Sequence, residues 1–355
     1  MARLDAKDRK LLYLLDFNCR KPYSQLAAQL RLSKRGVHYK LVRLQRDGIV
    51  LGYAPVINVC SLGYWYGRVF VKMQGLDSQL EKQVEVYMAR EANIGWAIRY
   101  YGPFDYGFTI WAKSLTEFKQ IANRFYLKFD RHIKRRVESV GTRVVFFKNR
   151  FLLSKEQRDL ADSKSLTMNE LDPRVKLDAL DFKLLAQLGR NARTPIVKLA
   201  RRTGETPKRV AYRLKRLAKQ GVLLGSRPVI DHEKLGYAYH KLFINLANLS
   251  ERQINALEKH VENDHRTVYV VKAIGTADFD VEIMAESNKD LYAFISEMQN
   301  KFPGVIKDYE LMTLTKTIKI SYLPQRTAEA RPAGKRPRQR TPDDTPRKAL
   351  IMLAR

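Results

Sequence analysis

Several residue types are scarce in this chain of 355 residues, and each scarcity excludes a class of protein. Only two cysteines are present, Cys19 and Cys60, too few for the disulfide framework of a secreted domain. Neither belongs to a Cys-x-x-Cys pair and the six histidines are scattered, so a structural zinc site is not expected. No apolar run reaches the roughly 20 residues that cross a bilayer, and the first residues lack a signal-peptide pattern. We therefore expect a cytoplasmic protein with no metal, no cofactor and no membrane partner.

Acidic side chains are few in comparison with basic ones. The chain has 66 Lys and Arg residues against 37 Asp and Glu residues, which gives a formal net charge of +29 at pH 7. A charge of this sign and size favours a polyanionic partner, most often a nucleic acid.

The chain repeats itself at an offset of 173 residues. Residues 4–64 and 177–237 align without a gap, with 27 identities in 61 positions. The same offset places Gly102 and Asp105 on Gly275 and Asp278. The sequence therefore predicts two copies of one two-domain unit. The predicted boundaries are 1–64 and 177–237 for the short repeats, 65–153 and 238–323 for the long repeats, 154–176 for a polar linker, and 324–355 for a basic disordered tail.

The positive charge is concentrated in the short repeats. Residues 1–64 carry 12 basic and 4 acidic side chains, and residues 177–237 carry 14 and 5. Residues 238–323, in contrast, carry 10 basic and 12 acidic side chains. This distribution indicates that the short repeats contact nucleic acid.

Each short repeat is predicted to be a winged helix-turn-helix domain. In the first copy the pattern predicts helices over 5–17 and 23–30, and a third from an N-cap at Ser33 to about residue 47. Strands at 49–51 and 56–57, on either side of a turn, would form a small β-wing. A basic third helix after a short turn is typical of DNA binding. The predicted DNA contacts are Ser33, Lys34, Arg35, His38, Tyr39, Lys40 and Arg43, with Thr206, Lys208, Arg209, Tyr212, Arg213 and Arg216 in the second copy.

Each long repeat is predicted to have the order βαββαβ of a ferredoxin-like unit. The expected strands are 66–74, 94–101, 106–113 and 137–149 in the first copy, and 239–247, 267–274, 279–286 and 309–320 in the second. The expected helices are 77–90 and 114–129, with 250–263 and 288–301 in the second copy. The predicted fold class is therefore α+β.

Both halves resemble the Lrp/AsnC family of prokaryotic transcription regulators. The resemblance depends on Leu-Asp-x-x-Asp-x-x-x-Leu at the start of each copy, Leu32-Ser33 before the third helix, residues 48–52, and the two Gly-x-x-Asp turns. It implies double-stranded DNA as the partner. It also implies that effector domains pair through their sheets, either within one chain or in a homo-oligomer. A small-molecule effector, commonly an amino acid, would bind near Gly102, Asp105, Gly275 and Asp278.

Three functions are compared on this basis. The first is a DNA-binding, nucleoid-associated transcription regulator, and the second is a nucleoid-type architectural protein without an effector. The third is an enzyme, because sirohaem decarboxylases resemble the same architecture and need histidines in the effector domains. Here those histidines are His132 in the first copy, and His240, His260 and His265 in the second, so the paired helix-end histidines have no counterpart. We therefore expect a regulator that is not an enzyme.

Overall fold

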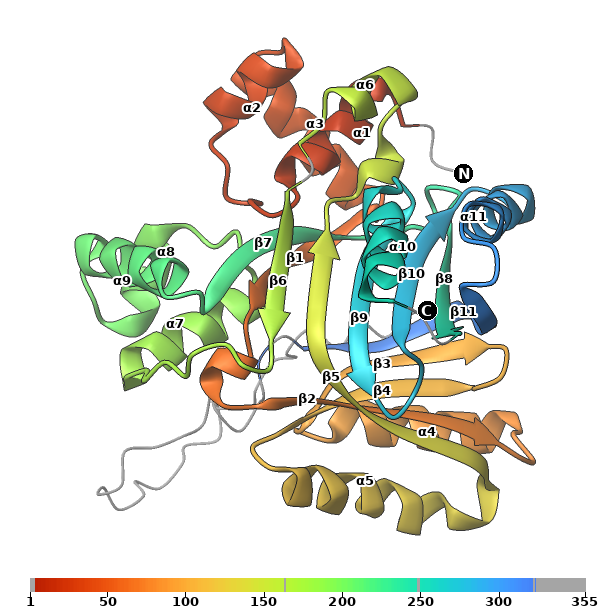
Figure 1. The fold of residues 1–355 in the computed structure, drawn as a ribbon. Coiled ribbons are helices and arrows are strands. Elements are labelled where there is room, and N and C mark those ends of the chain that lie inside the picture. Colours follow the sequence, from red (N-terminus) through yellow and green to blue (C-terminus); the bar gives the residue numbers. More distant parts are fainter. Residues whose placement is uncertain (1–3, 163, 248–249, 322, 324–355) are drawn as a thin grey trace, which may run out of the picture.

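The first helix-turn-helix unit is held together by a reciprocal cap. The structure of the chain is a computed structural model that describes residues 4–162, 164–247, 250–321 and 323 (Figure 1). This first unit begins at Asp5. Its helices are α1 (Ala6–Leu15), α2 (Tyr23–Leu30) and α3 (Lys34–Arg46). The Asp5 carboxylate accepts the Asp8 N–H at 2.7 Å, and the Asp8 carboxylate accepts the Asp5 N–H at 3.1 Å. This capping box fixes where α1 begins.

The second copy repeats the same unit. Its helices are α7 (Ala179–Arg190), α8 (Ile196–Thr203) and α9 (Pro207–Lys219). Asp178 and Asp181 form the same reciprocal cap, at 3.0 and 3.2 Å. Pro207 occupies the first helical position, where a missing N–H leaves no hydrogen bond unmade. Both predicted three-helix units are confirmed.

The predicted β-wing is wrong in one respect, because each copy contributes a single strand there. β1 (Val50–Ile57) runs through the expected turn and pairs antiparallel with β7 (Leu223–Ile230) of the other copy. Gly52 does not adopt the positive φ that a tight turn would need. The extended backbone instead forms a two-stranded ribbon that joins the two helix-turn-helix units, which lie on either side of it (Figure 1).

Both long repeats are ferredoxin-like units, as predicted, so the α+β class is confirmed. The first contains β2 (Trp65–Met73), α4 (Ser78–Arg90), β3 (Ile94–Tyr101), β4 (Tyr106–Ala112), α5 (Leu115–Phe129) and β5 (Ile133–Phe147). The second contains β8 (Ala238–Leu246), α10 (Glu251–Asn263), β9 (Thr267–Ile274), β10 (Phe279–Ala285), α11 (Asn288–Lys301) and β11 (Ile306–Ile320). The strand orders, β5-β2-β4-β3 and β11-β8-β10-β9, are the same in the two copies.

The two sheets join into one closed barrel within the chain. The first part of β5 pairs with β2 and its end pairs with β9 of the other copy. β11 likewise pairs first with β8 and then with β3. Each of these strands has 15 residues, long enough to belong to both sheets. The two halves therefore pair with each other in this structure, and the strands of the two copies cross (Figure 1).

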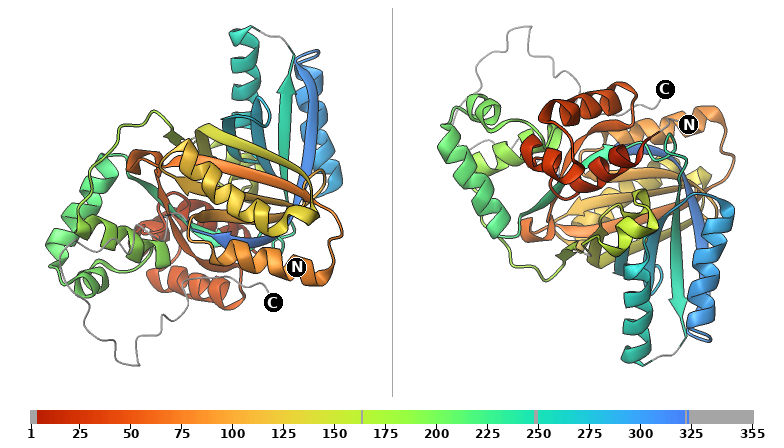
Figure 2. Two further views of the ribbon diagram at one scale, coloured as in Figure 1. Left: turned by 90° about the horizontal axis from the view of Figure 1, so that it is seen from below. Right: turned by 90° about the horizontal axis from the view of Figure 1, so that it is seen from above.

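Helices cover the outside of this barrel while aromatic side chains fill its inside. α4 and α5 pack on the outer face of the first sheet, and α10 and α11 on the outer face of the second (Figure 2). The inner face of the barrel buries Phe70, Tyr100, Phe104, Tyr239 and Phe243. The interface between the copies therefore buries an aromatic cluster, which is continuous with the core of the first helix-turn-helix unit.

The predicted linker 154–176 is docked on the barrel. It contains α6 (Lys155–Asp159) and β6 (Ser165–Asn169), and β6 pairs antiparallel with β5. Leu166 and Met168 alternate with polar residues and are buried.

Short 3-10 helices lie at Cys60–Leu62, Asp130–His132 and Arg150–Leu152. The predicted tail, 324–355, lies outside the described residues. In the described part of the chain, no helix has the length and apolarity needed to span a membrane.

Candidate nucleic-acid interface

The first turn of α3 presents an exposed basic and aromatic surface. Ser33 caps it, with its hydroxyl oxygen accepting the Gly36 N–H at 3.0 Å. Lys34 and Arg35 follow and are exposed, as is His38 one turn later. The side chain of Tyr39 is 64% exposed, which is high for an aromatic ring. The first two turns of α3 can therefore offer backbone N–H groups, two cations and two aromatic rings to a partner.

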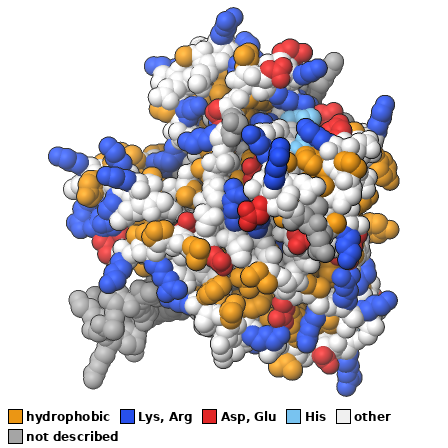
Figure 3. All heavy atoms as spheres, in the orientation of Figure 1, with side chains coloured by type: hydrophobic (Ala, Val, Ile, Leu, Met, Phe, Trp, Pro, Cys, Tyr) orange, Lys and Arg blue, Asp and Glu red, His pale blue; other side chains and the backbone are white. Residues whose placement is uncertain are grey.

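The first turn of α9 presents a related but not identical surface. The Thr206 hydroxyl oxygen accepts the Arg209 N–H at 3.2 Å, and Lys208 is exposed. Tyr212, which is equivalent to Tyr39, is 65% exposed. Ala211 stands where the first copy has histidine. Lys and Arg side chains project from both helix-turn-helix units on the face shown in Figure 3.

Two predicted DNA contacts of the first copy are held against α1 instead of facing outward. Lys40 Nζ lies 2.6 Å from the Asp5 carboxylate and 3.0 Å from that of Asp8. Arg43 forms a second ion pair with Asp8, whose side chain is fully buried. These contacts tie α3 to the start of α1.

The second copy uses the equivalent residues in the same way. Arg213 Nη1 lies 2.5 Å from Asp178 and 3.4 Å from Asp181, and Arg216 also pairs with Asp181. Asp181 is fully buried. Arg213 and Arg216, like their equivalents, therefore tie α9 to the start of α7. DNA contact stays a prediction for all the residues named for it, the four ion-paired side chains included.

The Gly-x-x-Asp turn of the first copy has a structural role in the barrel. Gly102 has a φ of +141°, and a Cβ there would lie against the carbonyl oxygen of Leu311. The Asp105 carboxylate accepts the Met73 N–H at 2.7 Å and pairs with Lys72 at 2.8 Å.

The second Gly-x-x-Asp turn is similar. Gly275 has a φ of +100°, and a Cβ there would lie against the carbonyl oxygen of Glu138, in the other copy. The Asp278 carboxylate accepts the Leu246 N–H at 2.6 Å. Both turns thus dock one copy onto the long strand of the other, and effector binding by these four residues stays a prediction.

Sequence reasoning missed a group of charged side chains inside the barrel. Arg68, Lys241, Asp280 and Glu282 are all buried there. The sequence pattern that could have predicted this group is an alternation in β10. Asp280 and Glu282 stand at alternate positions there, and the apolar residues between them face the helices. A charged residue at alternate positions of an otherwise apolar strand indicates an inner polar face.

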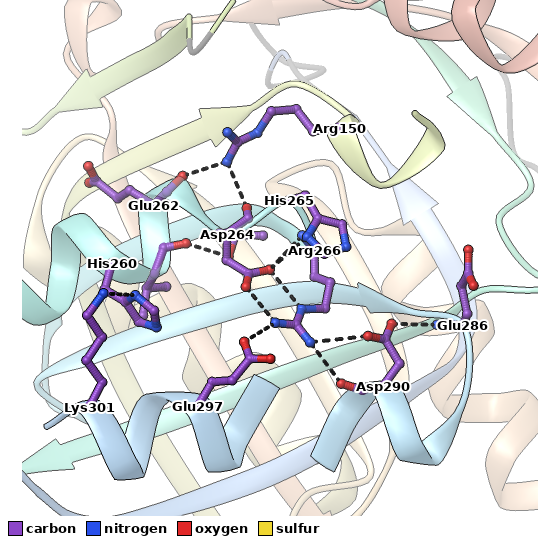
Figure 4. Close-up of polar contacts among 12 residues, drawn as sticks. Arg150, His260, Glu262, Asp264, His265, Arg266, Glu286, Asp290, Glu297 and Lys301 are labelled. Atoms are coloured by element: carbon purple, nitrogen blue, oxygen red, sulfur yellow. Dashed lines mark hydrogen bonds and ion pairs between the residues drawn. The ribbon is translucent and has the colours of Figure 1, made fainter. Parts of the chain in front are cut away.

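The histidines required by the enzyme hypothesis do not gather at one place. His240 is buried on β8, with Nδ1 3.0 Å from the Thr313 Oγ1. His260 lies in the last turn of α10 and His265 lies just after the helix, beside a network centred on Arg266 (Figure 4). Arg266 pairs with Asp264 at 2.6 Å, Asp290 at 3.2 Å and Glu297 at 2.7 Å. Among the described residues, no group of three or more His, Cys, Asp or Glu side chains is arranged to hold a metal ion.

Buried histidines should make the fold less stable in mild acid. Burial lowers the pKa of His232 and of His240 below the ordinary value of 6.5. The unfolded chain therefore binds protons near pH 6.5 while the folded chain does not, so stability falls as pH drops below that value. We expect the thermal midpoint to be constant from pH 8 to 7 and to fall from pH 6.5 to 5. His240→Gln should reduce this slope, and an unchanged slope in that variant would contradict the prediction.

The fold and the exposed basic helices define a protein with two DNA-binding-type helix-turn-helix domains. The AsnC-type helix-turn-helix domain matches residues 4–45 and again residues 177–218. The Regulatory protein AsnC of Haemophilus influenzae is 26% identical over 120 residues, 34% of this chain and 79% of that protein. The regulator FL11 of Pyrococcus horikoshii is 24% identical over 151 residues, 42% of this chain and 98% of that protein. The chain therefore carries two AsnC-type helix-turn-helix domains in tandem and is similar to regulators of the Lrp/AsnC type.

A solved structure matches the whole tandem arrangement. The siroheme decarboxylase NirDL superposes with a TM-score of 0.59 at 14% identity, covering 91% of this chain and 96% of that one. At this identity the likeness concerns the fold alone. It nevertheless overturns our expectation that the chain is not an enzyme, because a protein of the same tandem fold is one.

Proposed function

We propose that this chain is a transcription regulator that binds double-stranded DNA through α3 and α9 of a single molecule. The two AsnC-type domains and the regulator relatives support DNA binding in general. The observation that carries the finer proposal is the equivalent exposed, capped and basic first turn in both copies. The N–H groups of such a turn donate hydrogen bonds to phosphates, and its Lys and Arg side chains form ion pairs with them. A few side chains can also reach base edges.

One chain would then do what two subunits of a one-copy regulator do. Because the halves pair through the barrel and the β1–β7 ribbon, the two recognition helices are fixed in one molecule. The helices differ, with His38 in one and Ala211 in the other, so we propose a bipartite site without two-fold symmetry. A cytoplasmic, nucleoid-associated location follows from this proposal.

Binding to random genomic fragments as a function of salt tests this function. We expect retention at about 100 mM salt that falls steeply as salt rises, because phosphate contacts release counterions. Sequencing the retained DNA should reveal an asymmetric motif. Retention without a motif would support the architectural protein instead, and no retention at that salt concentration would contradict DNA binding.

An amino-acid effector at the Gly-x-x-Asp turns is part of the proposal, and adding amino acids during the titration tests it.

A second candidate function is chemistry on a tetrapyrrole. It is favoured by the tandem fold shared with NirDL, which was also solved with an iron-uroporphyrin III analogue at a TM-score of 0.58. In this chain the barrel cations Arg68 and Lys241 are already paired with acids. Absorption spectra recorded while the chain is titrated with iron-uroporphyrin III would decide. A saturable shift of the main absorption band supports this candidate, and an unchanged spectrum contradicts it.

A further inference from the structure

Four charged side chains form one closed group inside the barrel. Arg68 pairs with Asp280 across the boundary between the copies. Lys241 lies 3.0 Å from Asp280 and 2.7 Å from Glu282. All four side chains are at most 3% exposed. Arg68 also donates to the hydroxyl oxygen of Ser139, at 2.6 Å from Nη2.

The two copies contribute unequally to this group. At the offset of 173 residues, Arg68 and Lys241 are equivalent, so each copy supplies one cation from its first sheet strand. Asp280 is equivalent to Gly107, and Glu282 to Thr109. Both acids therefore come from the second copy, and the first copy depends on its partner to neutralise its arginine.

This asymmetry makes the charge of the interior depend on which copies pair. A first copy with a second copy buries two cations and two acids, as observed. Two first copies would bury two arginines with no acid from these positions, and two second copies would bury two lysines with four acids. Unbalanced buried charge is strongly unfavourable, since a charge in the interior needs a partner.

We propose that this buried group makes the first sheet bind a second-copy sheet and reject another first-copy sheet. It is an interaction surface whose partner is specified by charge, and it prevents chains from joining through like copies. The packing supports the same preference. Phe104 packs against both Phe70 and Phe243, with ring centroids 5.9 and 6.2 Å from its own, whereas its equivalent is the small Ala277. Two first copies would bring two such rings together, and two second copies would bring none.

Refolding of the full chain with an uncharged interior tests this proposal. The variant carries Arg68→Met, Lys241→Met, Asp280→Asn and Glu282→Gln. Wild-type and variant chains are unfolded in urea and refolded by dilution at several concentrations, and light scattering gives their masses. We expect wild type to refold as single chains. The fraction of two-chain and larger species should rise at least about tenfold in the variant, because like-copy pairing no longer buries unpaired charge.

A matched control neutralises an exposed pair, Lys119→Met with Glu138→Gln, which should refold as wild type does. If the uncharged variant returns to single chains as completely as wild type, or if wild type itself refolds into larger species, the proposal is overturned.

A second measurement does not depend on refolding of that variant. Asp280→Asn should lower the thermal midpoint, and adding Arg68→Met should raise it again. Simply additive losses would contradict the pairing across copies.

Discussion

Replacing Asp16 by Ala should lower the free energy of unfolding by roughly 3–5 kcal/mol, because it removes the carboxylate that neutralises a buried arginine. Asp16 follows α1 and its side chain is fully buried. Its two carboxylate oxygens accept Nε and Nη2 of Arg227 on β7, both at 2.9 Å. One oxygen also accepts the Asn149 N–H at 2.9 Å. This carboxylate therefore joins the first helix-turn-helix unit, the ribbon strand of the second, and the segment that follows β5.

Urea unfolding followed by circular dichroism measures the effect. The control is Asp47→Ala, which removes the partner of Arg46 in an exposed pair at 3.1 Å. Exposed pairs of this kind contribute about 0–1 kcal/mol. Asp16→Asn should give an intermediate loss, since the amide oxygen still accepts one hydrogen bond. Equal losses for Asp16→Ala and the control would show that the buried pair does not stabilise the fold.

Local structure was predictable because its causes lie close together in the sequence. Ser33, Thr206 and the Asp caps act on N–H groups two or three residues away, so helix starts follow from residue type alone. The strand order of each ferredoxin-like unit follows from the order of its elements. The internal repeat allowed each of these assignments to be made twice, independently.

The resemblance implied that the effector domains pair through their sheets, but whether they pair within one chain or between chains stayed open, because this depends on contacts nearly half a chain apart. Residues 50–57 have the Gly and Pro of a turn, yet they form a strand because β7 is available as a partner. The exposed-looking Lys40 and Arg43 are ion-paired because the fold brings Asp8 beneath them. A charged residue in a sequence does not show whether its partner is a phosphate or a carboxylate.

Removal of the exposed cations from either recognition helix alone should weaken DNA binding by about 10–100-fold near physiological salt. One variant carries Lys34→Ala and Arg35→Ala, and the other carries Lys208→Ala and Arg209→Ala. All four side chains are exposed at the first turns of α3 and α9. If each contacts a phosphate, each pair should lower the slope of log affinity against log salt by about 1.8.

The matched control removes the same charge elsewhere, through Lys289→Ala and Lys307→Ala, two exposed lysines of the second effector domain. Its slope and affinity should stay close to those of wild type. Fluorescence anisotropy with a single duplex, repeated at several salt concentrations, gives both quantities. Under the proposed function a single duplex engages both helices, which the barrel and ribbon hold in one molecule, so the two helix variants should be similarly impaired. If one variant binds like the control, only one helix contacts DNA. That result would contradict the proposal that one chain binds DNA through both helices, as two subunits of a one-copy regulator do.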